Sequence, residues 1–124
     1  MAFRVLRLDE LDWSTPSAGD QTRGIVRLSD EMSRMRANIW RHPPGSRGRR
    51  HVETVQDEVF VVLEGTSTIA LGDPPELVAA PAGSVVIVEP GTAIQLGNEG
   101  SEDAVILAVG APPEQGGAEY LSDA

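Results

Sequence analysis

The stretch that decides the fold is residues 45–65, which read GSRGRRHVETVQDEVFVVLEG. His51 and Glu53 are two residues apart, so in a β-strand their side chains point to the same face. Glu58 follows after a short loop and can join them, and the apolar run behind it stops at a glycine. We therefore expect one imidazole and two carboxylates to lie close together where a new strand begins.

The rest of the chain carries short apolar runs of about four to eight residues, separated by Gly, Pro, Asn and Asp, which predicts many short strands. The expected strands are residues 3–8, 24–28, 35–41, 59–63, 66–71, 77–80, 84–88, 93–96 and 104–109. Asp9 is expected to cap the one helical turn, at residues 9–13. Such strands must hide their edges and bury one face each, which favours an all-β jelly-roll barrel or sandwich. Periodicity alone leaves an immunoglobulin-like sandwich open.

Composition sets the outer limits. The 124 residues fit a single domain, 1–124, that can bury a core without disulfides. Residues 111–124 contain few core-forming side chains and are expected to lie as a tail on the surface. The chain has no cysteine, so any metal must be held by nitrogen and oxygen.

The charge and the hydropathy of the chain limit the kinds of partner and the cellular location that we expect. The net charge of -9 argues against nucleic acid as a partner. No apolar run is long enough to cross a bilayer, and the N-terminal residues lack the apolar stretch of a secretory signal. We expect a cytoplasmic protein that does not associate with membranes.

The first of two spaced motifs resembles that of the cupin superfamily. The family motif places a glycine, a His-x-His pair, a glutamate and a closing glycine in order along the chain. Four of these places are filled here, by Gly45, His51, Glu58 and Gly65. Glu53 stands where the family has its second histidine.

The second motif of the family has a glycine, a Pro-x-Gly turn, a metal-binding histidine and an asparagine. Gly83, Gly91 and Asn98 match it, whereas Pro90 is displaced by one residue. Ile94 replaces the histidine. The resemblance therefore keeps the frame of the motif and loses one of its ligands.

The two motifs together span roughly residues 43 to 98. The resemblance implies a double-stranded β-helix, the cupin barrel, with the first-motif ligands pointing inward and usually surrounding a divalent metal. It also implies a homodimer, for which apolar side chains on the outer face of a sheet would supply the interface. The candidates for that interface are Val59, Val61, Val85 and Ile87.

The donor set decides which metal is expected. One imidazole and two carboxylates suit Mn, Fe(II) or Zn, or a weakly held Mg or Ca. Ile94 cannot supply a fourth ligand, and strand alternation aims Gln95 to the opposite face. His42 is the remaining candidate, with packing or exposure at the surface as its alternative. The trio of His51, Glu53 and Glu58 can also form a metal-free polar cluster, in which a histidine or an arginine balances the acids.

Further side chains are candidates for lining the interior. In a regular strand, Arg36 shares a face with Asn38 and Trp40, so Arg36 is a candidate partner for the acids or for a ligand carboxylate. Trp40 and Phe60 are expected either to pack the barrel or to line a ligand pocket.

Two predictions concern residues beyond the site. Met32 and Met35 are expected to fill the core. The arginines of the 47–50 loop, Arg47, Arg49 and Arg50, are expected to be solvated, with attraction of an anionic ligand as the alternative.

No nucleophile or phosphate-loop motif is present in the chain. The function favoured by the sequence is binding of a small polar or anionic molecule, with a metal weakly held or absent. The alternative is a metal-dependent cupin enzyme of the dioxygenase, decarboxylase or isomerase type, so whether the protein is an enzyme stays open. The expected ligand-binding residues are His51, Glu53, Glu58, Trp40, Arg36 and Phe60.

Overall fold

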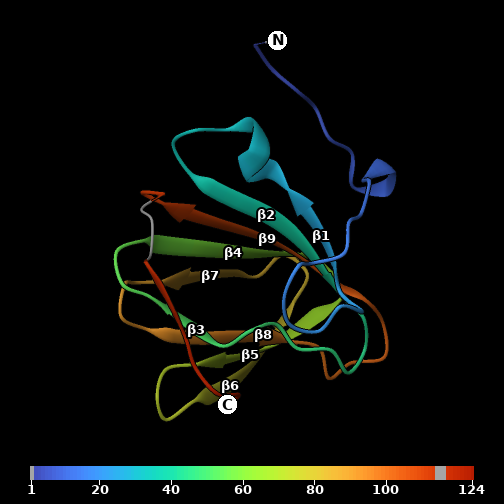
Figure 1. The fold of residues 1–124 in the computed structure, drawn as a ribbon. Helices are drawn as coiled ribbons and strands as arrows, with labels where there is room; N and C mark the ends of the chain where they lie inside the picture. The colour runs from blue at the N-terminus through green and yellow to red at the C-terminus, as the bar shows by residue number, and fades with distance from the viewer. Residues whose placement is uncertain (1, 114–116) are drawn as a thin grey trace.

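The computed structural model describes residues 2–113 and 117–124. These residues form two five-stranded antiparallel sheets that face each other (Figure 1). One sheet has the order β1-β2-β9-β4-β7, and the other has the order β10-β3-β8-β5-β6. The strands are β1 (Gly24–Arg27), β2 (Arg36–His42), β3 (His51–Glu53), β4 (Asp57–Glu64), β5 (Thr66–Leu71), β6 (Glu76–Pro81), β7 (Val85–Val88), β8 (Ala93–Gly97), β9 (Ala104–Ala111) and β10 (Ala118–Tyr120). This confirms the predicted all-β jelly-roll fold.

The apolar core lies between the two sheets and is supplied by β4 to β9. On β4, Phe60 and Val62 are buried while the residues between them are partly exposed, as alternation along a strand requires. Fully burying a side chain of this size stabilises the fold by about 1.5–3 kcal/mol. The buried core residues are Phe60, Val62, Ile69, Ala80, Val88, Ile94, Leu96, Ala104 and Ile106. None of this cluster comes from β1, β2 or β3, although Ile25 on β1 and Ala37 and Ile39 on β2 are also buried. The polar interior is built largely from these three strands.

Gly65 ends β4 in a way that accounts for the closing glycine of the first motif. Its φ is +68°, a conformation that side chains rarely adopt. A Cβ atom at this position would collide with the backbone oxygen of Asp103. The turn into β5 therefore requires glycine for two separate reasons.

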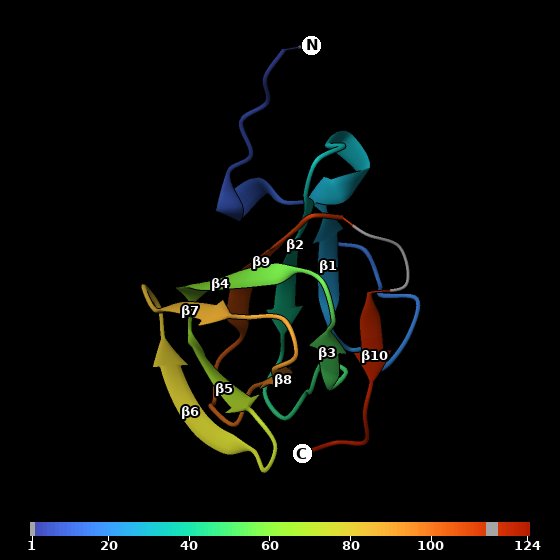
Figure 2. The ribbon, with the colours of Figure 1, turned by 90° about the vertical axis from the view of Figure 1, so that its left-hand side faces the viewer.

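The strand expected at residues 3–8 is not formed, which corrects the sequence prediction. Phe3, Val5 and Leu6 are exposed, and this segment leads away from the two sheets (Figures 1 and 2). The free edge of β1 is bridged by Ser14, which pairs with Ile25, so the first residues have no edge to join there.

The helical turn is shorter than predicted and is capped differently. It is a 3-10 turn, η1 (Leu8–Glu10), with Arg7 at its N-cap position and no side-chain cap. Asp9 lies inside the turn and accepts a hydrogen bond from the Arg7 guanidinium at 3.2 Å. The expectation that Asp9 caps the turn is therefore wrong.

Met32 and Met35 are also not where they were expected. They lie between a second 3-10 turn, η2 (Leu28–Glu31), and β2, and their exposed fractions are 40% and 39%. They do not fill the core, because this connection lies outside the space between the sheets.

The C-terminal segment 111–124 carries a strand that the sequence did not predict. β10 pairs antiparallel with β3, and Figure 2 shows the two strands side by side. Beyond it, the backbone N–H of Leu121 donates to the carbonyl oxygen of Arg50 at 2.8 Å. Residues 114–116 of the expected tail lie outside the described residues. No helix among the described residues is long and apolar enough to span a membrane.

Candidate functional site

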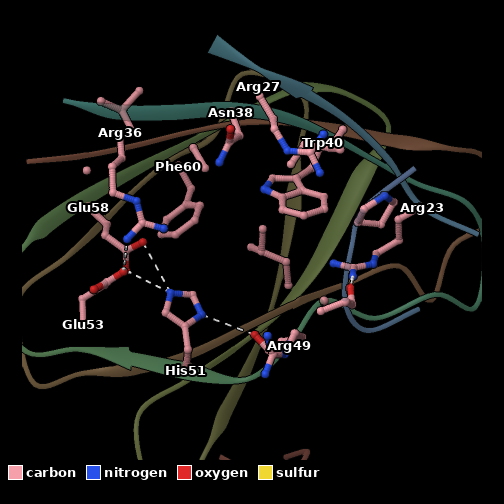
Figure 3. Close-up of a pocket in the computed structure, with 18 of the residues that line it drawn as sticks. Arg23, Arg27, Arg36, Asn38, Trp40, Arg49, His51, Glu53, Glu58 and Phe60 are labelled. Carbon is pink, nitrogen blue, oxygen red and sulfur yellow. Dashed lines mark hydrogen bonds and ion pairs between the residues drawn. The ribbon is translucent and has the colours of Figure 1, made fainter. Parts of the chain in front are cut away.

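A cavity of about 270 Å³ lies between the sheets, at the end of the molecule formed by β1, β2 and β3. All six residues that the sequence analysis proposed for ligand binding line it, as Figure 3 shows. They are Arg36, Trp40, His51, Glu53, Glu58 and Phe60. The wall also contains polar residues that the sequence analysis did not single out for the cavity, among them Arg23, Arg27, Gln56 and Tyr120.

His51, Glu53 and Glu58 form a compact cluster at one end of the cavity. One potential ligand atom of each lies within 4.8 Å of the others. His51 Nε2 is 3.4 Å from Glu58 Oε1, and both carboxylates are buried. β3 brings the first two residues to one face by alternation, and β4 begins beside them with the third.

Arg36 supplies a cation for this cluster. Its Nη1 donates a hydrogen bond to Glu53 Oε1 at 3.3 Å. Arg36 reaches Glu53 from β2, in the opposite sheet, on the face that the sequence analysis expected it to share with Asn38. With His51 beside Glu58, each buried acid has a basic neighbour, and an acid without one would be costly to bury.

The pKa of His51 reflects two opposing effects. Burial alone would lower it, since the charged imidazolium loses its hydration. The hydrogen bond and negative charge of Glu58, the carbonyl oxygen of Arg49 and the charge of Glu53 outweigh that effect. The net result is a pKa raised above its usual value of 6.5.

The cluster fits a divalent cation in its donor atoms but not in its number of protein ligands. Among the described residues, Glu53 Oε2 and Glu58 Oε1 are buried without a hydrogen-bond partner. A cation could satisfy both oxygens, with His51 as the nitrogen donor. Ile94, fully buried, pairs with His51 in the β3–β8 register and has no atom to offer.

Gln95 faces away from the cluster, as strand alternation predicted. Its side-chain Nε2 donates to the carbonyl oxygen of Gly48 and to Asp123 Oδ1, each at 2.9 Å. It therefore cannot replace the missing ligand.

A different set of side chains occupies the opposite end of the cavity. His42 is only 1% exposed, and neither ring nitrogen has a hydrogen-bond partner among the described residues. It lies outside the cluster of potential metal donors. The pKa of His42 is lowered to about 4 by burial and then by the charge of Arg23. His42 is therefore a neutral imidazole at neutral pH.

Arg23 was missed by the sequence analysis, although a signal for it was present. It precedes β1, and alternation from residue 23 through Ile25 to Arg27 places all three on the cavity wall. The guanidinium of Arg23 lies 4.7 Å from the centroid of a Trp40 ring. Reading 23–27 as one alternating face would have marked two arginines as candidates.

The arginines of the 47–50 loop divide into three environments. Arg49 lines the cavity, and its guanidinium lies 3.5 Å from the ring centroid of Tyr120. Arg50 is 8% exposed and donates hydrogen bonds to the carbonyl oxygens of Gly72 and Ser122. The prediction of a solvated loop is therefore wrong for Arg50, whereas Arg47 and Arg49 are exposed.

Comparison with known proteins identifies the family. The family model described as a cupin domain matches residues 38–110, which is more than half of the chain. The chain therefore belongs to the cupin family. No curated protein sequence matches it significantly.

Solved structures with the same fold cover nearly the whole chain. A conserved protein with a double-stranded β-helix domain from Klebsiella pneumoniae has a TM-score of 0.77 at 22% identity, covering 98% of this chain and 99% of that one. A sugar phosphate isomerase of the cupin superfamily from Silicibacter pomeroyi has a TM-score of 0.78 at 23% identity, with coverages of 97% and 83%. A predicted oxalate decarboxylase from Thermotoga maritima has a TM-score of 0.74 at 22% identity, with coverages of 88% and 99%. At these identities the likeness establishes the fold and leaves the activity open.

Proposed function

We propose that this cupin binds a small anionic or polar molecule in the cavity between its sheets and holds any metal weakly. The observation that carries the proposal is the concentration of arginines on the cavity wall. The chain has a net charge of -9 and only ten basic residues. Four of them line this one cavity: Arg23, Arg27, Arg36 and Arg49. An acidic protein that gathers guanidinium groups in a concave site has the electrostatics to attract and orient an anion.

The charges of the acid cluster support a weakly held metal. Arg36 pairs with Glu53, and His51, whose pKa is raised, contacts Glu58. A divalent cation would have to bind beside the Arg36 guanidinium, whose charge opposes it, and would compete with a proton for His51. The replacement of the family's histidine by Ile94 acts in the same direction.

Calorimetric titration of the purified protein tests the proposal, with inorganic phosphate and acetate as anions and glycerol as the uncharged control. We expect saturable binding of at least one anion, no heat from glycerol, and less than one equivalent of metal by elemental analysis. Stoichiometric, tightly held iron or manganese would contradict the weak-metal proposal. Absence of any anion binding would contradict the proposed ligand class.

The alternative, a metal-dependent enzyme, rests on the unpartnered oxygens Glu53 Oε2 and Glu58 Oε1. His51, Glu53 and Glu58 would hold the metal, which would supply Lewis-acid or redox chemistry when bound. Glu58→Ala is then expected to abolish metal retention and turnover together. Metal content that survives this substitution would exclude the assignment.

A further inference from the structure

The cavity has two chemically different ends. Glu53 and Glu58 lie at one end with His51, and Arg23 lies at the other, with the aromatic rings of Trp40 and Phe60 between them (Figure 3). At the acid end Arg36 already donates to Glu53 Oε1, and His51 Nε2 lies 3.4 Å from Glu58 Oε1. Glu53 Oε2 and Glu58 Oε1 still have no hydrogen-bond partner among the described residues and can accept one. The far end carries guanidinium groups, which only donate them. A ligand that spans the cavity therefore needs a hydrogen-bond donor at the acid end and an acceptor at the far end.

Arg23 is a buried cation without a carboxylate partner among the described residues. It is 4% exposed, and its Nε and Nη2 donate to the carbonyl oxygens of Asp20 and Ala18 at 2.7 and 2.8 Å. These two bonds fix the plane of the guanidinium and leave Nη1 without a hydrogen bond to the described residues. The Asp20 carboxylate accepts hydrogen bonds from Thr22 and favours the charged form of Arg23 only through its own charge, without a hydrogen bond to the guanidinium. A buried charge in this position is costly unless an anion reaches it.

His42 presents a second set of unpaired groups beside Arg23. A Cβ atom built on Gly48 would lie 3.6 Å from both Arg23 Nη1 and His42 Cε1, so these two side chains meet next to that glycine. Both ring nitrogens of His42 lack a hydrogen-bond partner among the described residues. A neutral imidazole has one N–H to donate, and an unpaired buried donor is expensive.

Arg49 adds a second positive charge at this end. It lines the cavity, and a Cβ atom built on Gly19 would lie 2.7 Å from Arg23 Nη2 and 3.0 Å from Arg49 Cγ, so the two side chains run close together. Burial lowers the pKa of Arg23, and the charge of Arg49 acts in the same direction while that of Asp20 opposes it. Two neighbouring cations repel in the absence of an anion and share it when one binds. The unpaired Nη1, the unpaired imidazole N–H and the second cation can all be satisfied by one oxyanion.

We propose that Arg23, His42 and Arg49 form an oxyanion subsite, and that the ligand carries a carboxylate or phosphate there and a hydroxyl or amine group at the Glu53 and Glu58 end. This inference rests on the proposed function and specifies the class of ligand and its orientation. Glu53 Oε2 and Glu58 Oε1 accept from the donor group, while the oxyanion lies against Arg23 and His42.

Calorimetric titration with paired probes tests both ends. Glycerate and glycerol 3-phosphate carry an oxyanion at one end and a hydroxyl group at the other, whereas propionate carries only the anion and glycerol only hydroxyl groups. We expect tight binding only from probes that carry both the oxyanion and the hydroxyl group. The first two probes share two hydroxyl groups and differ in the kind of oxyanion, in its charge and in one CH2–O unit of length. Their relative affinities therefore show whether the subsite prefers the compact carboxylate or the larger, more highly charged phosphate.

Arg23→Gln removes the central cation and is expected to weaken the anionic probes about tenfold or more, as loss of a charge-assisted hydrogen bond does. Arg47→Gln is the matched control, since it makes the same charge change in an exposed residue outside this cavity, and should leave the Kd within about twofold. Glu58→Gln is expected to weaken glycerate and leave propionate unchanged.

His42→Gln provides a second route if Arg23→Gln does not fold, as checked by circular dichroism. It removes the imidazole without changing the charge at neutral pH and should also weaken the anionic probes. Folded variants at residues 23 and 42 that bind the anions as tightly as the unmodified protein would overturn the subsite while the proposed function stands. If none of the probes, inorganic phosphate or acetate binds the unmodified protein, the proposed function fails and the subsite fails with it.

Discussion

Burial changes the chemistry of His42 more than its position in the sequence suggests. It follows Trp40 on β2 and shares its face, and the sequence makes it the remaining candidate for a fourth ligand once Ile94 and Gln95 are set aside. In the fold its burial lowers the pKa most, the charge of Arg23 in the segment before β1 lowers it further, and the charge of Asp20 has the opposite effect. Burial thus keeps His42 neutral, and its position outside the cluster of His51, Glu53 and Glu58 separates it from the potential metal donors.

This burial predicts a pH dependence of stability. The pKa of His42 is about 4 in the fold, against an ordinary value of 6.5, so the unfolded chain binds the proton more readily. The stability that comes from keeping His42 neutral is fully present above the unfolded pKa and is lost as the pH falls toward the folded pKa. Between about pH 7.5 and about pH 5 the free energy of unfolding should fall by about 2 kcal/mol from this residue.

Urea denaturation of the unmodified protein and of His42→Gln at these two pH values measures that contribution. The amide of glutamine does not titrate, so the variant should show a smaller loss of stability by about the same amount. Equal losses in the two proteins would mean that His42 is protonated equally easily in the folded and unfolded chains.

Alternation along β8 separates two neighbouring residues into different environments. Ile94 is buried and pairs with His51 in register, whereas Gln95 points to the other side of the sheet and bonds to Gly48 and Asp123. The strand therefore places residue 94 beside the acid cluster and keeps residue 95 out of it. The side chain at residue 94 therefore controls how many protein ligands are available to a metal at the acid cluster.

Ile94→His should restore a nitrogen ligand beside the acid cluster. We expect divalent manganese to bind at least about tenfold more tightly to this variant, because a second imidazole completes a four-ligand set. Gln95→His is the matched control, with the same new side chain one residue along, and should not tighten manganese binding. Calorimetry and elemental analysis provide the comparison, and equal gains in both variants would contradict the predicted geometry.

The outer face of the β1-β2-β9-β4-β7 sheet is apolar across its strands. Residues paired directly across strands lie on the same face, and two rows of such pairs cross this sheet. The rows are Val26, Ile39, Leu107, Val61 and Val85, and Ala37, Val109, Val59 and Ile87. Val85 and Ile87 are 60% and 75% exposed, whereas Ala37 and Ile39 are already buried within the chain, so the open part of this face lies toward β4 and β7. A face of this kind usually has a partner in solution.

We propose that a second copy of this chain covers this face in a homodimer related by twofold symmetry. The rows contain no charged side chain, so the same surface can face itself without burying a charge. The notable exposure of Val85 and Ile87 on the edge strand β7 would end on dimer formation.

Size-exclusion chromatography with light scattering at micromolar concentration tests the dimer. Ile87→Glu should shift the protein toward monomer, because it places a charge in the interface. Leu77→Glu is the control, since Leu77 is 65% exposed on the other sheet and its substitution should leave the dimer intact. A monomeric unmodified protein would overturn the proposal.

Each end of the strands β4 to β9 lies within two residues of the end that the sequence predicted. Their alternation and their glycine and proline turns are local properties of the chain. The same local rule placed His51 and Glu53 on one face. The rule failed for residues 3–8, because a strand also needs a free edge to pair with, and a local pattern carries no information about which edges are available.

The sequence by itself determined an all-β barrel, one polar cluster of His51, Glu53 and Glu58, and the loss of a ligand at Ile94. Only the tertiary structure decided that Arg23 and His42 share the cavity with that cluster and that β10 pairs with β3. The reason is physical. Side-chain direction along a strand follows from its period of two, whereas the faces that meet across the barrel depend on pairings between distant segments.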